Sequence, residues 1–419
     1  MIMSINIYGE DFTELKNESD LSLVQENLQQ SIEVQSVRSI LSSYDPLEHT
    51  KGQLRAGYIH LAEDASPNRM AYGLAGHVHL YTPRWNGLMV GVEAYTVVNL
   101  QNNQKSSDLN SDFFDINGES FILFSQAYLN GKWGNTEIKL GRQSLDTPHA
   151  DSDDIRMIPN YFEAYRVINR DIENVTLTAG FITKMAGWEN GVDSSEFVNV
   201  GKTLGLDKNI DGVYCASASY EGFEDLSLDL WYYNYHNIAN VIYAQAGYAY
   251  TPSKDVSFIL GAQYDGSRET GDALLGVQDS RTYGISVETE FTNIGLTVLA
   301  ALNQDKGDSG AVGLSLGGGP LFTSMEDQTL DVMGTAGGAW IIGAGYNFRH
   351  LGVEALTIGV AYGSFESDDA SYASKEIDTV LEYNFNDMIS ASVAYASVDF
   401  KEYNKEDYHQ LRLIANYNF

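Results

Sequence analysis

The segment HQLRLIANYNF, residues 409–419, alternates between two kinds of side chain. Most of its apolar and aromatic residues fall on one face of an extended chain, and its polar residues fall on the other. This two-residue period is that of a β-strand whose faces meet different environments. The apolar face comprises Leu411, Leu413, Ala415, Tyr417 and Phe419, and the polar face comprises Gln410, Arg412, Asn416 and Asn418.

The same alternation recurs along most of the chain. WIIGAGYNF (residues 340–348) and LTIGVAYG (356–363) are clear examples, and about eighteen such segments follow residue 51. No convincing amphipathic helix separates them, which excludes folds that alternate strands with helices. So many strands in a soluble protein normally divide into domains, and no linker-like composition occurs. We therefore predict an all-β chain with one large sheet.

The connections between these segments alternate in length. Short turns occupy residues 82–86, 132–136, 221–225 and 251–255, and long polar segments occupy 101–118, 143–160, 188–210, 266–280 and 304–337. One expected long connection, near 236–239, is short. Short turns at one end and long loops at the other are typical of bacterial outer-membrane barrels. The prediction is a transmembrane antiparallel β-barrel of about eighteen strands over residues 51–419.

A membrane barrel also explains the two faces of each strand. Lipid requires the apolar face, and a water-filled interior permits the polar one. Aromatic residues near strand ends, Tyr72, Trp85, Trp133 and Tyr417, fit interfacial girdles, although ordinary edge-strand aromatics are an alternative for each one. Candidates for the lumenal wall are Arg55, His77, His79, Glu93, Lys132 and Arg412.

Composition limits the partners of the chain. Its 419 residues include 25 Lys and Arg against 57 Asp and Glu, a formal charge of −32. Such a chain is a poor ligand for nucleic acid and favours cations. A content of 12% aromatic and 43% hydrophobic residues distinguishes it from disordered acidic chains. The single cysteine, Cys215, excludes a disulfide framework.

The first fifty residues differ from the rest. Residues 21–44, LSLVQENLQQSIEVQSVRSILSSY, have helical spacing, and DPLEHTKG breaks the pattern before the first strand. We expect residues 1–50 to form a periplasmic or lumenal extension, partly helical or disordered; an artificially added tail is an alternative. The start lacks a basic stretch followed by an apolar run, so we expect a mature chain or a replaced leader.

One segment resembles a known family. LGRQSLDTPHADSDDIRMIPNYFEAYRV, residues 140–167, is similar to the segment that marks OprD-type outer-membrane porins, including the related acidic major porins. GQLRAGY (52–58) resembles the family's first strand, and the terminal residues Tyr417 and Phe419 resemble the signal read by the barrel-insertion machinery. The resemblance implies an eighteen-stranded barrel in the outer membrane of a Gram-negative bacterium, with a third external loop folded inward.

The resemblance also implies a set of pore residues. The inward loop corresponds to residues 143–160, which places Arg142, Asp146, Asp151, Asp153, Asp154 and Arg156 at the constriction. Carboxylates there raise the local cation concentration, and arginines set a transverse field. One alternative is a solvated loop tip with turn chemistry. Another is a Ca²⁺ site at Asp151, Asp153 and Asp154, although the DxDxDG pattern is absent.

The sequence therefore points to passive diffusion of small hydrophilic solutes and ions, with a preference for cations. A second possibility is a selective channel for carboxylates, amino acids or small peptides along lumenal arginines, and a third is a non-conducting surface or adhesin barrel. The related porins imply a homotrimer. No GxSxG occurs, so we expect no enzyme and no required cofactor. GGGP at 317–320 lacks the lysine of a phosphate loop and indicates flexibility.

Overall fold

A computed structural model describes residues 48–101, 108–401 and 405–419. The predicted extension at residues 1–50 falls outside this range except for its last three residues. None of the helices in the described residues is long and apolar enough to cross a membrane.

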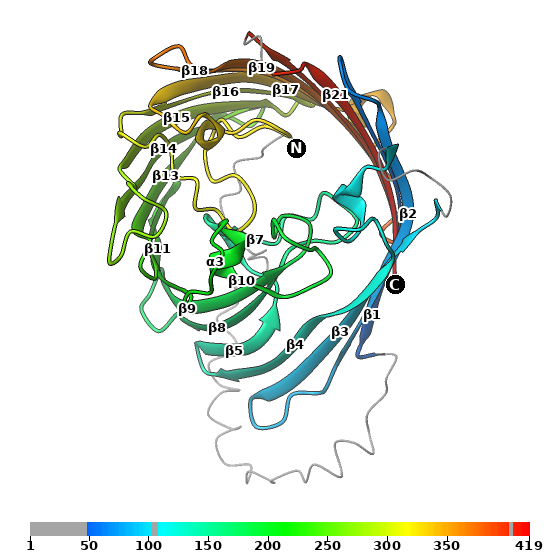
Figure 1. Ribbon diagram of the computed structural model, residues 1–419, viewed down its shortest axis with the longest axis vertical. Helices are drawn as coiled ribbons and strands as arrows, with labels where there is room; N and C mark the ends of the chain where they lie inside the picture. Colours follow the sequence, from blue (N-terminus) through cyan, green and yellow to red (C-terminus); the bar gives the residue numbers. More distant parts are fainter. Residues whose placement is uncertain (1–47, 102–107, 402–404) are drawn as a thin grey trace.

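Eighteen long strands within the described residues form one closed antiparallel sheet, because the last strand pairs with the first. Figure 1 shows the resulting ring, viewed along its axis. The predicted all-β barrel is confirmed. The strands are β1 (Thr50–Glu63), β2 (Arg69–Tyr81), β3 (Leu88–Asn99), β4 (Phe121–Trp133), β5 (Thr136–Gln143), β8 (Tyr161–Asn169), β9 (Val175–Ala186), β11 (Val213–Phe223), β12 (Leu226–Tyr235), β13 (Ala239–Ser253), β14 (Val256–Glu269), β15 (Ser280–Phe291), β16 (Leu296–Asp305), β17 (Gly337–Asn347), β18 (Leu356–Ser367), β19 (Ala373–Asn384), β20 (Ile389–Phe400) and β21 (Tyr408–Asn418).

The remaining elements are short and lie in the connections. They are β6 (Asp146–Thr147), β7 (Ala150–Asp151), β10 (Val198–Asn199), α3 (Val200–Thr203), η3 (Ser111–Phe113), η4 (Leu330–Met333) and η5 (Phe348–Leu351).

Strand pairing sorts the side chains between lipid and lumen. Where β1 closes on β21, Leu54 lies opposite Tyr417 and Arg55 lies opposite Asn416. Leu54 and Tyr417 are exposed outward, whereas Arg55 is buried inside the barrel. Successive side chains of a strand point to opposite faces, so the polar face of 409–419 lines the interior. Closure of the sheet gives the backbone groups of the first and last strands partners within the sheet, as lipid requires.

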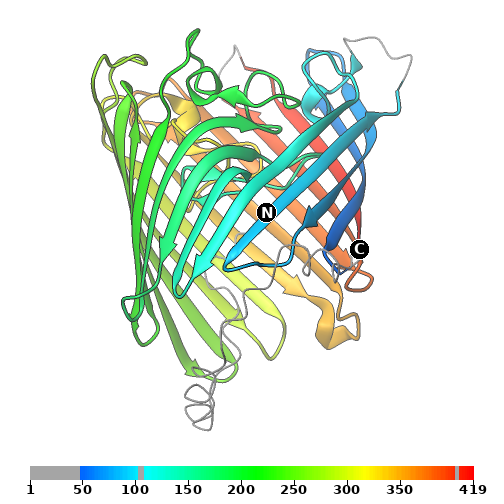
Figure 2. The same cartoon turned by 90° about the horizontal axis from the view of Figure 1, so that it is seen from below.

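The two ends of the barrel differ, as the connection lengths predict. Figure 2 shows tilted strands with large loops at one end and compact turns at the other. The loop after β5 spans residues 144–160, the loop after β9 spans 187–212, and the loop after β16 spans 306–336. By contrast, the turn between β4 and β5 is residues 134–135. Both β1 and β21 have their chain-terminal ends at the compact end.

Loops fill much of the lumen. Figure 1 shows β7, α3 and β10 inside the ring of strands. The largest hydrophobic cluster joins the loops to the inner wall of β8 to β13, and burial of this apolar surface drives the loops inward. Its members include Leu145 and Ala150, Val200 and Ile210, Tyr233 and Val241, and Val312, Leu314 and Leu316. An open space remains near β19, β20, β21 and β1.

Candidate functional site

The loop at residues 144–160, here the constriction loop, folds into the barrel. Its β6–β7 hairpin pairs Asp146 with Asp151 and Thr147 with Ala150. Pro148 sits at the hairpin tip, where its fixed φ and missing N–H prevent further strand pairing. Ala150 forms a bridge with Leu316, which belongs to residues 306–336, here the glycine-rich loop. The predicted inward fold is confirmed, and a second loop shares the lumen with it.

Arg55 fastens the constriction loop to the wall. Its two terminal nitrogens donate to the Asp154 carboxylate, at 2.5 Å to Oδ1 and 2.8 Å to Oδ2. Nη1 also donates to the Arg156 carbonyl at 2.6 Å, and Nε donates to Asn416 Oδ1 at 2.8 Å. The Arg55 side chain is 2% exposed, whereas that of Asp154 is 49% exposed. In this bidentate pair the carboxylate is therefore exposed to the lumen, and the guanidinium is buried.

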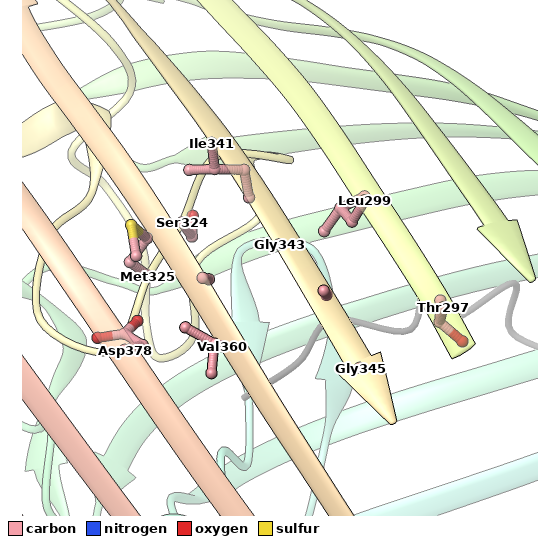
Figure 3. Close-up of a pocket in the computed structure, with 11 residues that line it drawn as sticks. Thr297, Leu299, Ser324, Met325, Ile341, Gly343, Gly345, Val360 and Asp378 are labelled. Carbon is pink, nitrogen blue, oxygen red and sulfur yellow. The ribbon is translucent and has the colours of Figure 1, made fainter. Parts of the chain in front are cut away.

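Two carboxylates on the wall strand β19 hold the glycine-rich loop by accepting hydrogen bonds from its backbone. Glu376 accepts hydrogen bonds from the Asp327 and Gln328 amides at 2.9 and 2.8 Å, and Asp378 accepts from the Glu326 amide at 3.0 Å. Figure 3 shows Ser324 and Met325 of this loop beside Asp378 and the wall residues Leu299 and Ile341. Glu326 in turn accepts from Arg412 Nη2 at 2.6 Å.

Arg156 stands where the two loops approach each other. Its guanidinium carbon lies 4.7 Å from the centre of the Trp188 ring, and its Nη2 lies 3.9 Å from Asp327 Oδ1. Trp188 donates from Nε1 to the Asp153 carbonyl at 2.9 Å, which fixes the ring. Asp327 also accepts from Gln410 on the wall. The Arg156 guanidinium therefore lies against the face of the Trp188 ring and near the Asp327 carboxylate of the glycine-rich loop.

Glycines allow the loops to touch. A Cβ at Gly317 would lie 2.4 Å from the Asp151 carbonyl oxygen, and φ at Gly317 is +104°. Gly318 donates from its backbone to Glu189, whose carboxylate also accepts from Asn160 at 2.6 Å. The GGGP segment therefore provides a close backbone contact with the constriction loop, rather than the flexibility that its composition indicated.

Replacement of Gly317 by alanine should separate the loops. The added Cβ would meet a backbone carbonyl and adopt a strained φ, which costs about 1 to 3 kcal/mol. We expect a larger and noisier single-channel conductance in planar bilayers. Gly276→Ala is the matched control, because φ at Gly276 is +78° but a Cβ added there would meet nothing within 4 Å. Equal conductance in both variants would contradict a role for the contact.

Burial changes the acidity of the loop carboxylates. It raises the pKa of Asp151 to about 6 and, together with the charges of Glu189 and Asp151, raises the pKa of Asp153 to about 8. Burial similarly raises the pKa of Asp327 to about 7, against the opposing effect of Arg156. The pKa of Glu189 is also raised by burial. The constriction therefore changes charge within the neutral pH range.

A second polar cluster lies on the wall of β2, β3 and β4. His77 Nε2 and His79 Nδ1 each lie 3.9 Å from Glu93 Oε2, so the three predicted wall residues are brought together. Glu93 also accepts from Ser125 Oγ at 2.7 Å and Gln126 Nε2 at 3.1 Å. Lys132, the remaining member of this wall set, lies exposed beside Trp133 at the end of β4.

The other predicted residues have separate neighbours. Arg142 donates to the Phe124 carbonyl at 3.1 Å and lies over the Phe197 ring, so its contacts are with β4 and the loop after β9. Asp146 is exposed on the hairpin. Tyr417 and Phe419 pack near each other at the end of β21, where Phe419 exchanges backbone hydrogen bonds with Gly52.

The three aspartates proposed for Ca²⁺ have different partners. Asp154 is held by Arg55, Asp151 accepts from the Asp153 amide, and Asp153 lies near Glu189. Among the described residues, no group of three or more His, Cys, Asp or Glu side chains is arranged to hold a metal ion. Calcium binding at these positions stays a prediction.

The open side of the lumen forms a cavity of about 300 Å³ below the two loops. Arg55 and Arg412 line it together with their carboxylate partners, Asp154 and Glu326. The rest of the wall consists of the Glu382 carboxylate, several apolar side chains, and the amides and hydroxyls of Gln53, Asn384, Asn416, Ser390 and Ser392. The cavity is therefore bounded by strands of the barrel and by the loops that constrict it, which is the geometry of a pore.

A family profile described as outer membrane porin, OprD family, matches residues 81–419. The chain belongs to the OprD family. This porin therefore resides in the outer membrane of a Gram-negative bacterium, and its long loops face outward while its short turns face the periplasm. No curated protein sequence matches the chain.

Solved structures support the fold of this porin. OpdK of Pseudomonas aeruginosa, solved with vanillate, superposes with a TM-score of 0.74 at 19% identity over 90% of this chain and 100% of OpdK. OccK9 (OpdG) of the same organism gives 0.77 at 18% identity over 88% and 98% of the two chains. A BenF-like porin of Pseudomonas fluorescens Pf-5 gives 0.76 at 17% identity over 88% and 98%.

Sequence reasoning missed part of the constriction of this OprD-family porin. Glu189, Glu326 and Asp327 lie in loops that carry no recognisable motif, and their partners are distant in sequence. Lys139 and Arg166, which face each other across β5 and β8, were also missed. Lys139 and Glu137 are two residues apart in a strand and therefore share a face, so this alternation could have marked Lys139 as a residue of the polar face.

Proposed function

We propose that this porin forms a water-filled channel for passive diffusion of small hydrophilic solutes and ions, with a preference for cations. The observation that carries the proposal is that three arginines of the constriction and the cavity each lie beside a carboxylate. Arg55 is paired with Asp154, Arg412 with Glu326, and Arg156 lies near Asp327. Additional carboxylates nearby have no arginine of their own in these pairs, namely Asp151, Asp153 and Glu189. As the pH rises and these acids ionise, the local field increasingly favours cations.

A selective channel for carboxylates, amino acids or small peptides is the alternative. OpdK was solved with vanillate, and Arg55 and Arg412 line the cavity of this porin. Each guanidinium already has a carboxylate partner, however, and therefore offers less to a solute anion. We therefore favour cations and zwitterions, whose amino groups the acidic constriction attracts.

A reversal-potential measurement tests the proposal. Purified protein in a planar bilayer should give discrete ohmic steps, and a KCl gradient should give a reversal potential toward the potassium equilibrium value. A preference for chloride would favour the carboxylate alternative. The absence of conductance steps would instead support a non-conducting surface or adhesin barrel, with the long loops as its contact surface.

The homotrimer implied by the family resemblance stays part of this proposal. Symmetric closure is the common rule for such assemblies. Sedimentation in a density-matched detergent should give three times the chain mass of 46.3 kDa. A single-chain mass would show that one barrel is the functional unit.

A further inference from the structure

An ionisable pair lies inside the largest hydrophobic cluster of the lumen. His149, at the tip of the constriction loop, has its Nε2 3.0 Å from Asp265 Oδ1 on β14, and their side chains are 0% and 1% exposed. Around them lie Leu145 and Ala150 of the same loop, with the wall residues Tyr233 and Tyr235. An apolar contact alone would hold this tip without the cost of removing polar groups from water. Apolar packing therefore does not account for the burial of this polar pair.

His149 also contacts three other elements, namely β12, β13 and the glycine-rich loop. Its backbone N–H points to Tyr233 Oη of β12 at 3.4 Å, and its carbonyl accepts from the Leu316 amide of the glycine-rich loop at 2.9 Å. The imidazole ring meets the edges of Tyr233 and Tyr243, with ring centres 5.3 and 6.2 Å apart. A change in the position of this residue would move both loops.

The side-chain pair depends on one mutual hydrogen bond. In the described part of the chain, neither His149 Nδ1 nor Asp265 Oδ2 has a hydrogen-bond partner. Removal of either side chain would thus leave the other as an unsatisfied polar group in an apolar cluster. A directional contact with no substitute partner defines one position of the loop, whereas apolar packing tolerates several.

We propose that His149 and Asp265 are a positioning pair that sets the bore of the pore. Their hydrogen bond holds the constriction loop against β14 and, through Leu316, holds the glycine-rich loop. Asp151, Asp153 and Asp154 then take their places in the lumen. This inference rests on the proposed channel for its electrical consequence, but the position of the loop has a readout of its own.

The single cysteine of the chain provides that readout. Cys215 on β11 belongs to the same hydrophobic cluster and lies opposite Tyr233 in the strand register. Its side chain is buried, and it shares a face with Val213, whereas Tyr214 is exposed outward. Release of the hairpin tip would uncover this thiol toward the lumen. A small charged thiosulfonate reagent, which needs water to reach its target, therefore reports the position of the loop.

Matched variants separate the hydrogen bond from packing. His149→Phe keeps an aromatic ring but removes the donor, and His149→Gln keeps an N–H near the position of Nε2 but removes the ring. Asp265→Leu removes the acceptor, and the double variant His149→Phe with Asp265→Leu replaces both polar groups with apolar ones. The full-length porin in detergent micelles and in planar bilayers is used throughout, and gel mobility of the folded barrel checks that each variant folds.

We expect His149→Phe and Asp265→Leu each to react at Cys215 roughly tenfold faster than the wild type, because each leaves a buried polar group unpaired. Both should also show a larger, noisier conductance. His149→Gln and the double variant should stay near the wild type in both readouts. If His149→Phe does not fold, Asp265→Leu with His149→Gln as its control carries the test.

Two results would overturn the proposal. Wild-type reactivity at Cys215 in both single variants would mean that packing alone holds the loop. Equal acceleration in His149→Gln and His149→Phe would mean that the imidazole ring, rather than its hydrogen bond, is responsible. Because thiol reactivity does not require ion flow, a barrel that fails to conduct would contradict the proposed function while leaving this test readable.

Discussion

Replacement of Asp154 by asparagine is expected to shift the ion preference of the pore about fivefold toward anions at low ionic strength. The Asp154 carboxylate neutralises the Arg55 guanidinium at the edge of the cavity. Asparagine keeps an oxygen acceptor, so Arg55 stays in place while its charge becomes uncompensated. One unit charge at about 4 Å in a water-like dielectric changes an ion's energy by about 1 kcal/mol, which corresponds to about fivefold.

The measurement is the reversal potential in a KCl gradient, repeated at low and high salt. Screening over a Debye length of about 8 Å at physiological ionic strength should reduce the shift as salt increases. Asp146→Asn is the matched control, because it removes one carboxylate from the same loop at an exposed hairpin position. Equal shifts in the two variants would show that total loop charge, rather than the Arg55 pair, sets the preference.

The barrel could be predicted from residues 409–419 and their repeats because lipid and water act on every second residue. That requirement is local, and it leaves a pattern within a single strand. Arg55 and Arg412 were candidates for the inner face for the same reason, and both line the cavity. The inward fold of the constriction loop followed from the resemblance of residues 140–167 to OprD-type porins, a segment whose charges and prolines are contiguous in sequence.

The loop contacts that narrow the pore leave no such local pattern in the sequence. Asp154 pairs with a residue 99 positions away, and Gly318 donates to a residue 129 positions away. The glycines at 317–318 are required by a carbonyl of another loop, so composition alone indicated only flexibility. Asp151, Asp153 and Asp154 looked alike in sequence, but only Asp154 is bound bidentately by a wall arginine. Replacing all three together would therefore mix two different effects.

Cation preference should increase as the pH rises from about 5 to about 9, with most of the change between about pH 6 and 8. The raised pKa values of Asp151, Asp327 and Asp153, about 6, 7 and 8, define this window. Below it these acids are protonated while the arginines stay charged, so anions gain access. Above it the acids add negative charge to the constriction.

The same groups predict how the loop arrangement responds to pH. Each pKa lies above the usual value of 3.8, so the folded loops bind protons more tightly than released loops do. Protonation therefore stabilises the closed arrangement fully at low pH. This contribution begins to fall as the pH rises above about 4, near the pKa of a released carboxylate, and it is lost once the pH exceeds the folded pKa values of about 6 to 8. Conductance should increase together with cation preference, because ionised acids repel one another and favour a wider opening.

Asp153→Asn separates this mechanism from titration of the outer loops. It removes the group with the highest of these pKa values and also relieves its repulsion with Glu189 and Asp151. The upper part of the transition, near pH 8, should disappear from both the reversal potential and the conductance. Asp146→Asn should leave that part intact, because Asp146 is exposed on the hairpin. A wild-type reversal potential that stays constant between pH 5 and 9 would show that the buried carboxylates keep a fixed charge in the conducting state, and selectivity would then rest on Asp154 and Glu326 with their arginines.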